Sequence, residues 1–166
     1  MIYNFPRVTA GIDLDSSIIT ELATHPNIVG VKLSCGNIGK LHRITTATKL
    51  SEFAVFPGRS DVFAQGLLSG SAGGIVALAN IAPKVHTRLF KLWTEGNQDE
   101  AMKIQAILGH GDWAVSKVGG ISGVKAVVNK EFGYGNGRVR GPLAPSDLGA
   151  EAYKSFDDLI ALEKTL

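Results

Sequence analysis

The chain has 166 residues, of which 45% are hydrophobic and 19% are charged, as expected for one soluble globular unit with an ordinary core. A formal net charge of +2, with basic residues scattered along the chain, argues against nucleic acid or an anionic membrane as a partner. No apolar run approaches the ~20 residues of a membrane span. Cys35 is the only cysteine, so an internal disulfide is excluded and a reducing compartment fits. We expect an intracellular protein, cytoplasmic or mitochondrial, and a targeting signal is not observable in this sequence.

Short apolar runs alternate with helical stretches through the first two-thirds of the chain. The predicted strands cover residues 2–5, 28–33, 53–56 and 73–77. Strands that alternate with helices at intervals of roughly 20–25 residues indicate βαβ units and a parallel sheet. Pro83 fits the first turn of the last helix of this region, where the missing N–H costs little.

The remainder of the chain contains helical patterns and no strand pattern. Asn97 and Glu100 have the spacing of a capping box, which predicts a helix running to about residue 110. A second helix is expected over residues 120–132, and a flexible glycine-rich loop follows it. A final helix is expected to bury one stripe, formed by Ala152, Phe156, Leu159 and Ile160. These helices are expected to be an appendage to the α/β unit.

Lys32 lies near the end of an apolar run where a charge is unexpected. Strand alternation places Val31 and Leu33 on one face, with Gly30 and Lys32 on the other. Gly30 would leave space beneath the lysine. An enclosed apolar site disfavours the ammonium form, and the neutral amine is a nucleophile toward carbonyls. The interpretation is a Schiff-base lysine, and the alternative is a lysine that extends from a strand end into water.

Four motifs together resemble one family. They are Tyr-Asn-Phe-Pro at residues 3–6, the run 25–32 that ends in Lys32, the glycine-rich run 70–80, and residues 117–125 followed by 140–143. In this order and spacing they resemble the pyruvate-dependent class I aldolases grouped with dihydrodipicolinate synthase and N-acetylneuraminate lyase. The match covers essentially the whole chain but only the second half of that family's barrel.

The resemblance implies an α/β fold: the second half of a (β/α)8 TIM barrel, with four parallel strands and their helices, plus a C-terminal helical extension. Residues 1–96 would contain strands five to eight of the family fold, and residues 97–166 the extension. The chain begins directly on a predicted strand, so Met1 could be an internal methionine of a longer polypeptide.

The resemblance also assigns roles to two residues. Lys32 would be the covalent amine and Tyr3 a proton relay, both at the carboxyl end of the barrel strands. No metal or diffusible cofactor is implied, because the imine on Lys32 is itself the electron sink. The alternative reading of Tyr3 is an aromatic residue at a strand end.

Four further residues are candidates for substrate binding. The resemblance places the main-chain carbonyl of Ile75 and the backbone of Gly36 in the cavity wall. Gly58 ends the third strand, and Arg59 after it could bind a carboxylate in two-pronged fashion. The alternatives are a core isoleucine and a surface arginine.

The expected activity is that of a Schiff-base lyase acting on a small 2-oxo acid, with pyruvate as product or donor. Residues 73–80 resemble 4-hydroxy-2-oxoglutarate aldolases and 2-keto-3-deoxy sugar-acid aldolases. Dihydrodipicolinate synthase itself is less well matched, because Val8 stands at its substrate-binding arginine and Ala10 lengthens the loop. The other alternative is a catalytically silent half barrel acting only in assembly, since the resemblance places the carboxylate-binding hydroxyl pair in the first half. Family members also imply a homo-oligomer at full length.

Other patterns carry less chemistry. The glycines at 70–74 lack the lysine and hydroxyl of a phosphate-binding loop, and those at 133–137 follow a helix, unlike a dinucleotide fingerprint. The four histidines lack metal-ligand spacing, so surface or capping roles are expected for them. Cys35 is expected to be a small packing residue.

Overall fold

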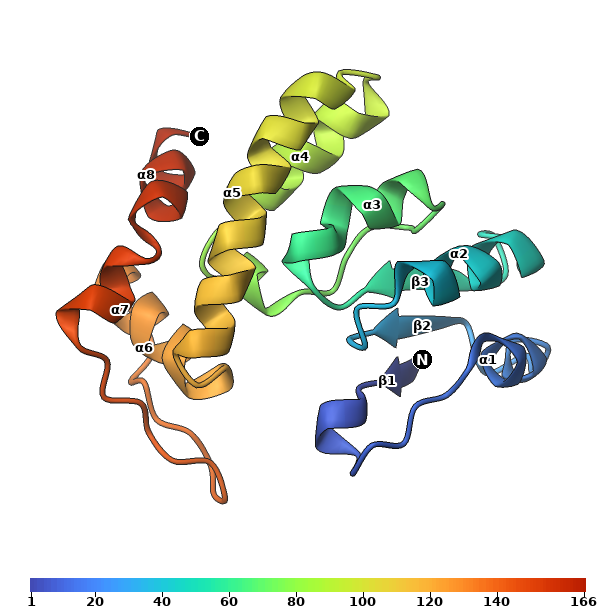
Figure 1. Ribbon diagram of the computed structural model, residues 1–166, viewed down its shortest axis with the longest axis horizontal. Coiled ribbons are helices and arrows are strands. Elements are labelled where there is room, and N and C mark those ends of the chain that lie inside the picture. The colour runs from blue at the N-terminus through green and yellow to red at the C-terminus, as the bar shows by residue number, and fades with distance from the viewer. The chain divides into compact units, whose positions relative to one another are not determined.

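A computed structural model describes residues 1–166 (Figure 1). The chain divides into two compact units, an N-terminal unit of residues Met1–Val76 and a C-terminal unit of residues Ala77–Leu166. This division differs from the domain boundary expected at residue 96, which stays a prediction.

The N-terminal unit is built on a three-stranded parallel sheet in the order β1-β2-β3 (Figure 1). The strands are β1 (Ile2–Asn4), β2 (Gly30–Leu33) and β3 (Ala54–Pro57). The connecting helices are α1 (Ser16–Leu22), α2 (Ile38–Ala47) and α3 (Phe63–Leu68), with 3-10 turns η1 (Pro6–Val8) and η2 (Ser60–Val62). Strand–helix alternation was therefore predicted correctly for the first three strands.

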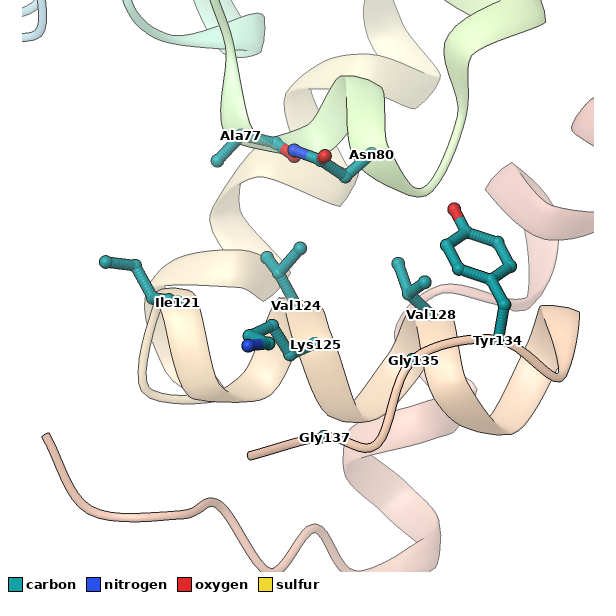
Figure 2. Close-up of a pocket in the computed structure, with 9 residues that line it drawn as sticks. All are labelled: Ala77, Asn80, Ile121, Val124, Lys125, Val128, Tyr134, Gly135 and Gly137. Carbon is teal, nitrogen blue, oxygen red and sulfur yellow. The ribbon is translucent and has the colours of Figure 1, made fainter. Parts of the chain in front are cut away.

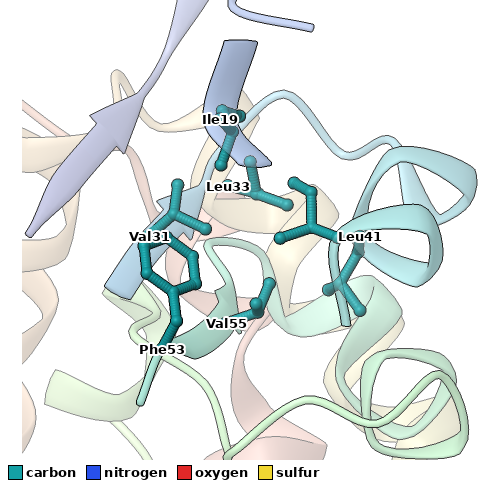
Figure 3. Packing of buried hydrophobic residues seen from close by; sticks show 7 residues of the cluster. Ile19, Val31, Leu33, Leu41, Phe53 and Val55 are labelled. Carbon is teal, nitrogen blue, oxygen red and sulfur yellow. The ribbon is translucent and has the colours of Figure 1, made fainter. Parts of the chain in front are cut away.

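One face of this sheet packs against helices α1 and α2. Val31 and Leu33 of β2, which the alternation placed together, are both buried. The cluster around them contains Ile19, Leu41, Ile44, Phe53 and Val55 (Figure 3). Burial of these aliphatic and aromatic side chains, each worth about 1.5–3 kcal/mol, is the main term that stabilises the unit. Lys32 lies on the opposite face.

The fourth predicted strand does not form. The backbone nitrogens of Ala72 and Ile75 donate to the carbonyl oxygens of Val55 and Pro57, at 3.0 and 3.1 Å. From the first bond to the second the segment advances by three residues, from Ala72 to Ile75, while β3 advances by two, from Val55 to Pro57. One extra residue therefore interrupts the ladder, as in a β-bulge. Gly73, with φ +143°, lies within the interruption.

The C-terminal unit contains helices and loops and no strand. Its elements are η3 (Ala77–Asn80), α4 (Pro83–Thr94), α5 (Gln98–Lys117), α6 (Ile121–Phe132), α7 (Ala150–Lys154) and α8 (Asp157–Thr165). Pro83 occupies the first turn of α4 as expected. A Cβ on Gly111 would lie 2.9 Å from Leu78 and 3.0 Å from Leu159, so glycine permits the close approach of η3 and α8 to α5.

Three details of the predicted helices were wrong. Helix α5 continues to Lys117, beyond the expected end at residue 110. Asn97 is the N-cap residue but makes no side-chain cap bond, and Glu100 pairs with Lys103 at 2.5 Å. The single predicted final helix is two helices, which a turn at Ser155 and Phe156 separates.

Helix α4 begins on a carboxylate from the other end of the unit. The Glu163 side chain of α8 is buried and accepts hydrogen bonds from the backbone nitrogens of Lys84 and Val85, at 3.2 and 3.0 Å. It therefore caps α4, as an anion near a helix N-terminus should. His86, which directly follows Val85, is also buried, so the expected surface role is wrong for this histidine. Burial lowers the pKa of His86, against the opposing effects of the Ala82 carbonyl and Glu163.

Candidate functional site

Tyr3 and Lys32 lie side by side on neighbouring parallel strands. The register of β1 and β2 pairs the two residues directly, and side chains paired in this way leave the same face of a sheet. Lys32 Nζ lies 4.3 Å from the centroid of the Tyr3 ring. Tyr3 is 51% exposed and Lys32 is partly buried. The structure brings the two predicted residues together, while the enclosed, uncharged amine expected of Lys32 stays a prediction.

A row of backbone hydrogen bonds runs across the carboxyl edge of the sheet. Ser34 N donates to Asn4 O at 2.9 Å, and Gly58 N donates to Leu33 O at 2.8 Å. The row ends with the bond from Ile75 to β3 described above. It places Gly58 and Ile75 at the edge where the strands of Tyr3 and Lys32 end. The Ile75 side chain is 37% exposed, which contradicts the alternative of a core isoleucine.

Ser34 is a neighbour of Tyr3 that the sequence reasoning did not identify. Its hydroxyl lies 3.5 Å from the Tyr3 hydroxyl, longer than an ordinary O–H···O hydrogen bond. A Cβ on Gly58 would lie 2.1 Å from Ser34 Oγ, so Gly58 leaves the room that Ser34 occupies. The available signal was alternation, because Ser34 is two residues beyond Lys32 and shares its face.

Gly30 supports the strand that carries Lys32. A Cβ at this position would lie 2.4 Å from the carbonyl oxygen of Ala54 on β3. The structure thus gives Gly30 a role in the close approach of β2 and β3, a different reason for glycine from the space beneath Lys32 that the sequence suggested.

Gly36 and Arg59 adjoin one another beyond the strand ends. Gly36 has φ +72°, and a Cβ on it would lie 3.4 Å from Arg59 Cδ. The guanidinium already binds a carboxylate: Arg59 Nε lies 3.1 Å from both Asp61 oxygens, and Nη2 lies 2.5 Å from Oδ2. A substrate carboxylate would therefore have to share or displace Asp61.

A buried polar network holds the loop that follows Tyr3. Asn4 is buried, donates to Asp13 Oδ1 at 2.7 Å and accepts from Leu14 N at 3.0 Å. Lys40 of α2 is also buried, pairs with Asp13 and donates to Leu14 O at 2.7 Å. The Asn4 hydrogen bond, followed by Lys40, lowers the pKa of Asp13. The network ties the end of the Tyr3 strand to the helix that follows the Lys32 strand.

Sequence reasoning missed this network, although one signal was present. Lys40 directly precedes Leu41 in a helix whose buried face includes Leu41 and Ile44. A lysine beside that face needs a partner, and Asp13 was the acidic residue nearest to the tyrosine motif.

Residues 1–166 contain no cluster of three or more histidine, cysteine, aspartate or glutamate side chains able to hold a metal ion. None of the helices combines the length and apolarity needed to cross a membrane.

The chain is similar over nearly all of its length to proteins of one family. The sequence profile of the Dihydrodipicolinate synthetase family matches residues 1–161. A 4-hydroxy-2-oxoglutarate aldolase of Emericella nidulans, named as mitochondrial, is 44% identical over 167 residues, covering 100% of this chain and 53% of the relative. An L-threo-3-deoxy-hexylosonate aldolase of Hypocrea jecorina is 41% identical, covering 100% of this chain and 55% of the relative.

Solved structures agree with the sequence matches. The crystal structure of a dihydrodipicolinate synthase family protein from Coccidioides immitis superposes with a TM-score of 0.81 at 35% identity, covering 99% of this chain and 55% of that one. The chain thus spans about half the length of the relatives it matches.

Proposed function

Because this chain belongs to the Dihydrodipicolinate synthetase family, we propose that it forms part of a Schiff-base aldolase acting on 2-oxo acids, with pyruvate as product or donor. The observation that carries the proposal is the direct pairing of Tyr3 with Lys32, with the amine 4.3 Å from the ring centroid. In this proposal residues 1–96 are the second half of a (β/α)8 barrel and residues 97–166 its helical extension.

The two residues would divide the chemistry between them. Lys32 Nζ attacks the C2 carbonyl of a 4-hydroxy-2-oxo acid, and Tyr3 donates its hydroxyl proton to the departing water, which leaves a protonated imine and a tyrosinate. The C3–C4 bond then breaks, its electron pair enters the enamine, and Tyr3 accepts the proton of the 4-hydroxyl as the aldehyde departs. Tyr3 returns this proton to C3, and water then hydrolyses the protonated imine to release pyruvate and the free amine, with the proton that is set free restoring the Tyr3 hydroxyl.

The relatives favour a particular substrate class. The names 4-hydroxy-2-oxoglutarate aldolase and L-threo-3-deoxy-hexylosonate aldolase both describe cleavage of a 2-oxo acid that is deoxygenated at C3 and hydroxylated at C4. In the proposal Gly36, Gly58 and the Ile75 carbonyl line the substrate site. Arg59 would bind a second carboxylate if it released Asp61. The whole enzyme is proposed to be a homo-oligomer.

A second candidate is a half barrel without activity of its own. The chain covers 53–55% of its aldolase relatives, and the resemblance assigns the hydroxyl pair that anchors the pyruvate carboxylate to the first half. Without that anchor the keto acid would lose orientation at Lys32, and a large part of the rate with it.

Reductive trapping tests the proposal. The purified chain is incubated with pyruvate and borohydride, digested, and mapped by mass spectrometry. We expect a reduced pyruvate adduct on the peptide containing Lys32, its loss in Lys32→Met, and its retention in Lys49→Met, which removes an exposed lysine. A folded chain with no adduct would support the silent half barrel, and a Lys32→Ala variant with full aldol cleavage would refute the Schiff base.

A further inference from the structure

The C-terminal unit contains a cavity of about 360 Å³, within the size range of small-molecule sites (Figure 2). We infer that this cavity binds an amphipathic monoanion, a carboxylate with an apolar body about the size of a phenyl or hexyl group. The inference is independent of the proposed aldolase chemistry, and none of the residues that line the cavity has a role in it.

The floor of the cavity is apolar. Val124 and Val128 are buried residues of α6, and Figure 2 shows both side chains pointing from the helix toward η3. Ile121 extends this wall at one end, and the ring of Tyr134 stands at the other. Such walls favour a hydrocarbon chain or ring, because each Å² of apolar area that it buries contributes about 25 cal/mol.

The polar groups of the cavity indicate which charge its ligand carries. Lys125 is an exposed residue of α6 beside Val124, and it is the only charged residue that lines the cavity. Asn80 adds an amide whose Nδ2 donates to Ala77 O at 2.9 Å, while no carboxylate side chain is present in the lining. A cation and an amide without a competing acid fit a carboxylate head group.

The glycine-rich wall is held in place before any ligand arrives. Asn129 of α6 donates to Gly135 O at 2.6 Å, and Arg138 N donates to Asn136 Oδ1 at 3.0 Å. Gly133, Gly135 and Gly137 have φ between +67° and +74°, which lets this loop turn back along α6. A largely preformed wall reduces the ordering cost of binding.

The test uses 3-phenylpropionate and its neutral amide, which share the same apolar body. Binding to the ¹⁵N-labelled full chain is followed by amide chemical shifts and by calorimetry. We expect saturable carboxylate binding at about 0.1–5 mM, shifts at residues 121–128 and 134–137, and about five-fold weaker binding of the amide. Added salt should weaken binding of the carboxylate alone.

Exposed lining residues allow variants that keep the fold. Lys125→Gln should weaken carboxylate binding about five-fold and leave amide binding unchanged, while Ile121→Gln should weaken both about three-fold. Lys103→Gln, which removes an exposed lysine on α5, should change neither. Equal affinity for acid and amide, an unaffected Lys125→Gln, shifts confined to other residues, or no saturable binding would each overturn the inference.

Discussion

Gly58 and Ser34 approach so closely that no side chain fits between them: a Cβ on Gly58 would lie 2.1 Å from Ser34 Oγ and 2.8 Å from Ser34 Cα. The hydroxyl could rotate away, but the backbone of β2 could not move without disturbing its pairing with β1 and β3. We therefore expect Gly58→Ala to lower the free energy of unfolding by about 1–3 kcal/mol, measured as a lower urea midpoint.

Gly109 provides a matched control. It lies inside α5, and a Cβ at this position would meet no atom within 4 Å. Gly109→Ala should raise stability by about 0.5–1 kcal/mol, because alanine loses less backbone entropy on forming a helix. Equal midpoints for Gly58→Ala and the unsubstituted chain would show that the strand ends are looser than described.

The Lys40–Asp13 pair gives a second stability prediction. Lys40 exposes 4% of its side chain and Asp13 exposes 46%, so removal of one partner should cost more stability than at a surface ion pair and less than at a fully buried one. Lys40→Ala should cost about 1–2 kcal/mol, because it removes the ion-pair partner of Asp13 and the donor to Leu14 O.

The exposed ion pair of Lys49 with Glu52 is the control for the Lys40–Asp13 pair. The Lys49 and Glu52 side chains are 78% and 67% exposed. Lys49→Ala should therefore change the free energy of unfolding by less than about 0.5 kcal/mol. Similar losses in the two alanine variants would mean that Lys40 contributes no more than a surface charge.

The Tyr3–Lys32 pairing shows what a sequence can establish. The family resemblance implied that Tyr3 and Lys32 meet at the carboxyl ends of neighbouring parallel strands, and alternation set Lys32 on the face opposite Val31 and Leu33. The buried partners of Lys40 could not be predicted, because Asp13 is 27 residues away in the chain and only the packed helix brings them together.

The helical periodicity of the last predicted helix did not reveal that this helix is broken. Phe156, Leu159 and Ile160 are buried as the helical stripe predicted, yet the helix stops and restarts at Phe156. A stripe depends on which side chains face the core, and an interruption confined to Ser155 and Phe156 preserves that facing. The missing fourth strand has a related cause, since its apolar pattern contains no signal for the extra residue near Gly73.

His86 should make stability depend on pH near neutrality. Burial lowers its folded-state pKa below the ordinary value of about 6.5, so the unfolded chain binds its proton first as the pH falls. Stability from this residue is complete above about pH 6.5 and is lost as the pH falls through the folded-state pKa. Urea midpoints measured between about pH 8 and pH 5 should therefore decline, with a smaller slope in His86→Gln.

His110→Gln removes an exposed histidine and serves as the control for this slope. The urea midpoint of His110→Gln should decline with falling pH as much as that of the unsubstituted chain. If His86→Gln kept the full decline as well, another group would have to be responsible for it.

Tyr3→Phe separates the hydroxyl from the ring. The ring that lies 4.3 Å from Lys32 Nζ is kept, so folding and the position of the amine should change little. In the proposed mechanism the hydroxyl supplies the proton that lets water leave as the imine forms, and general acid–base assistance of this kind is worth about 10²–10⁴ in rate. Timed borohydride quenching should show the Lys32 adduct accumulating more slowly by a factor in that range, while long incubation restores its amount.

Ser34→Ala, which removes a hydroxyl 3.5 Å from that of Tyr3, should slow trapping far less. Unchanged trapping in Tyr3→Phe would assign the proton to another group and leave Lys32 as the only chemical participant in this pair.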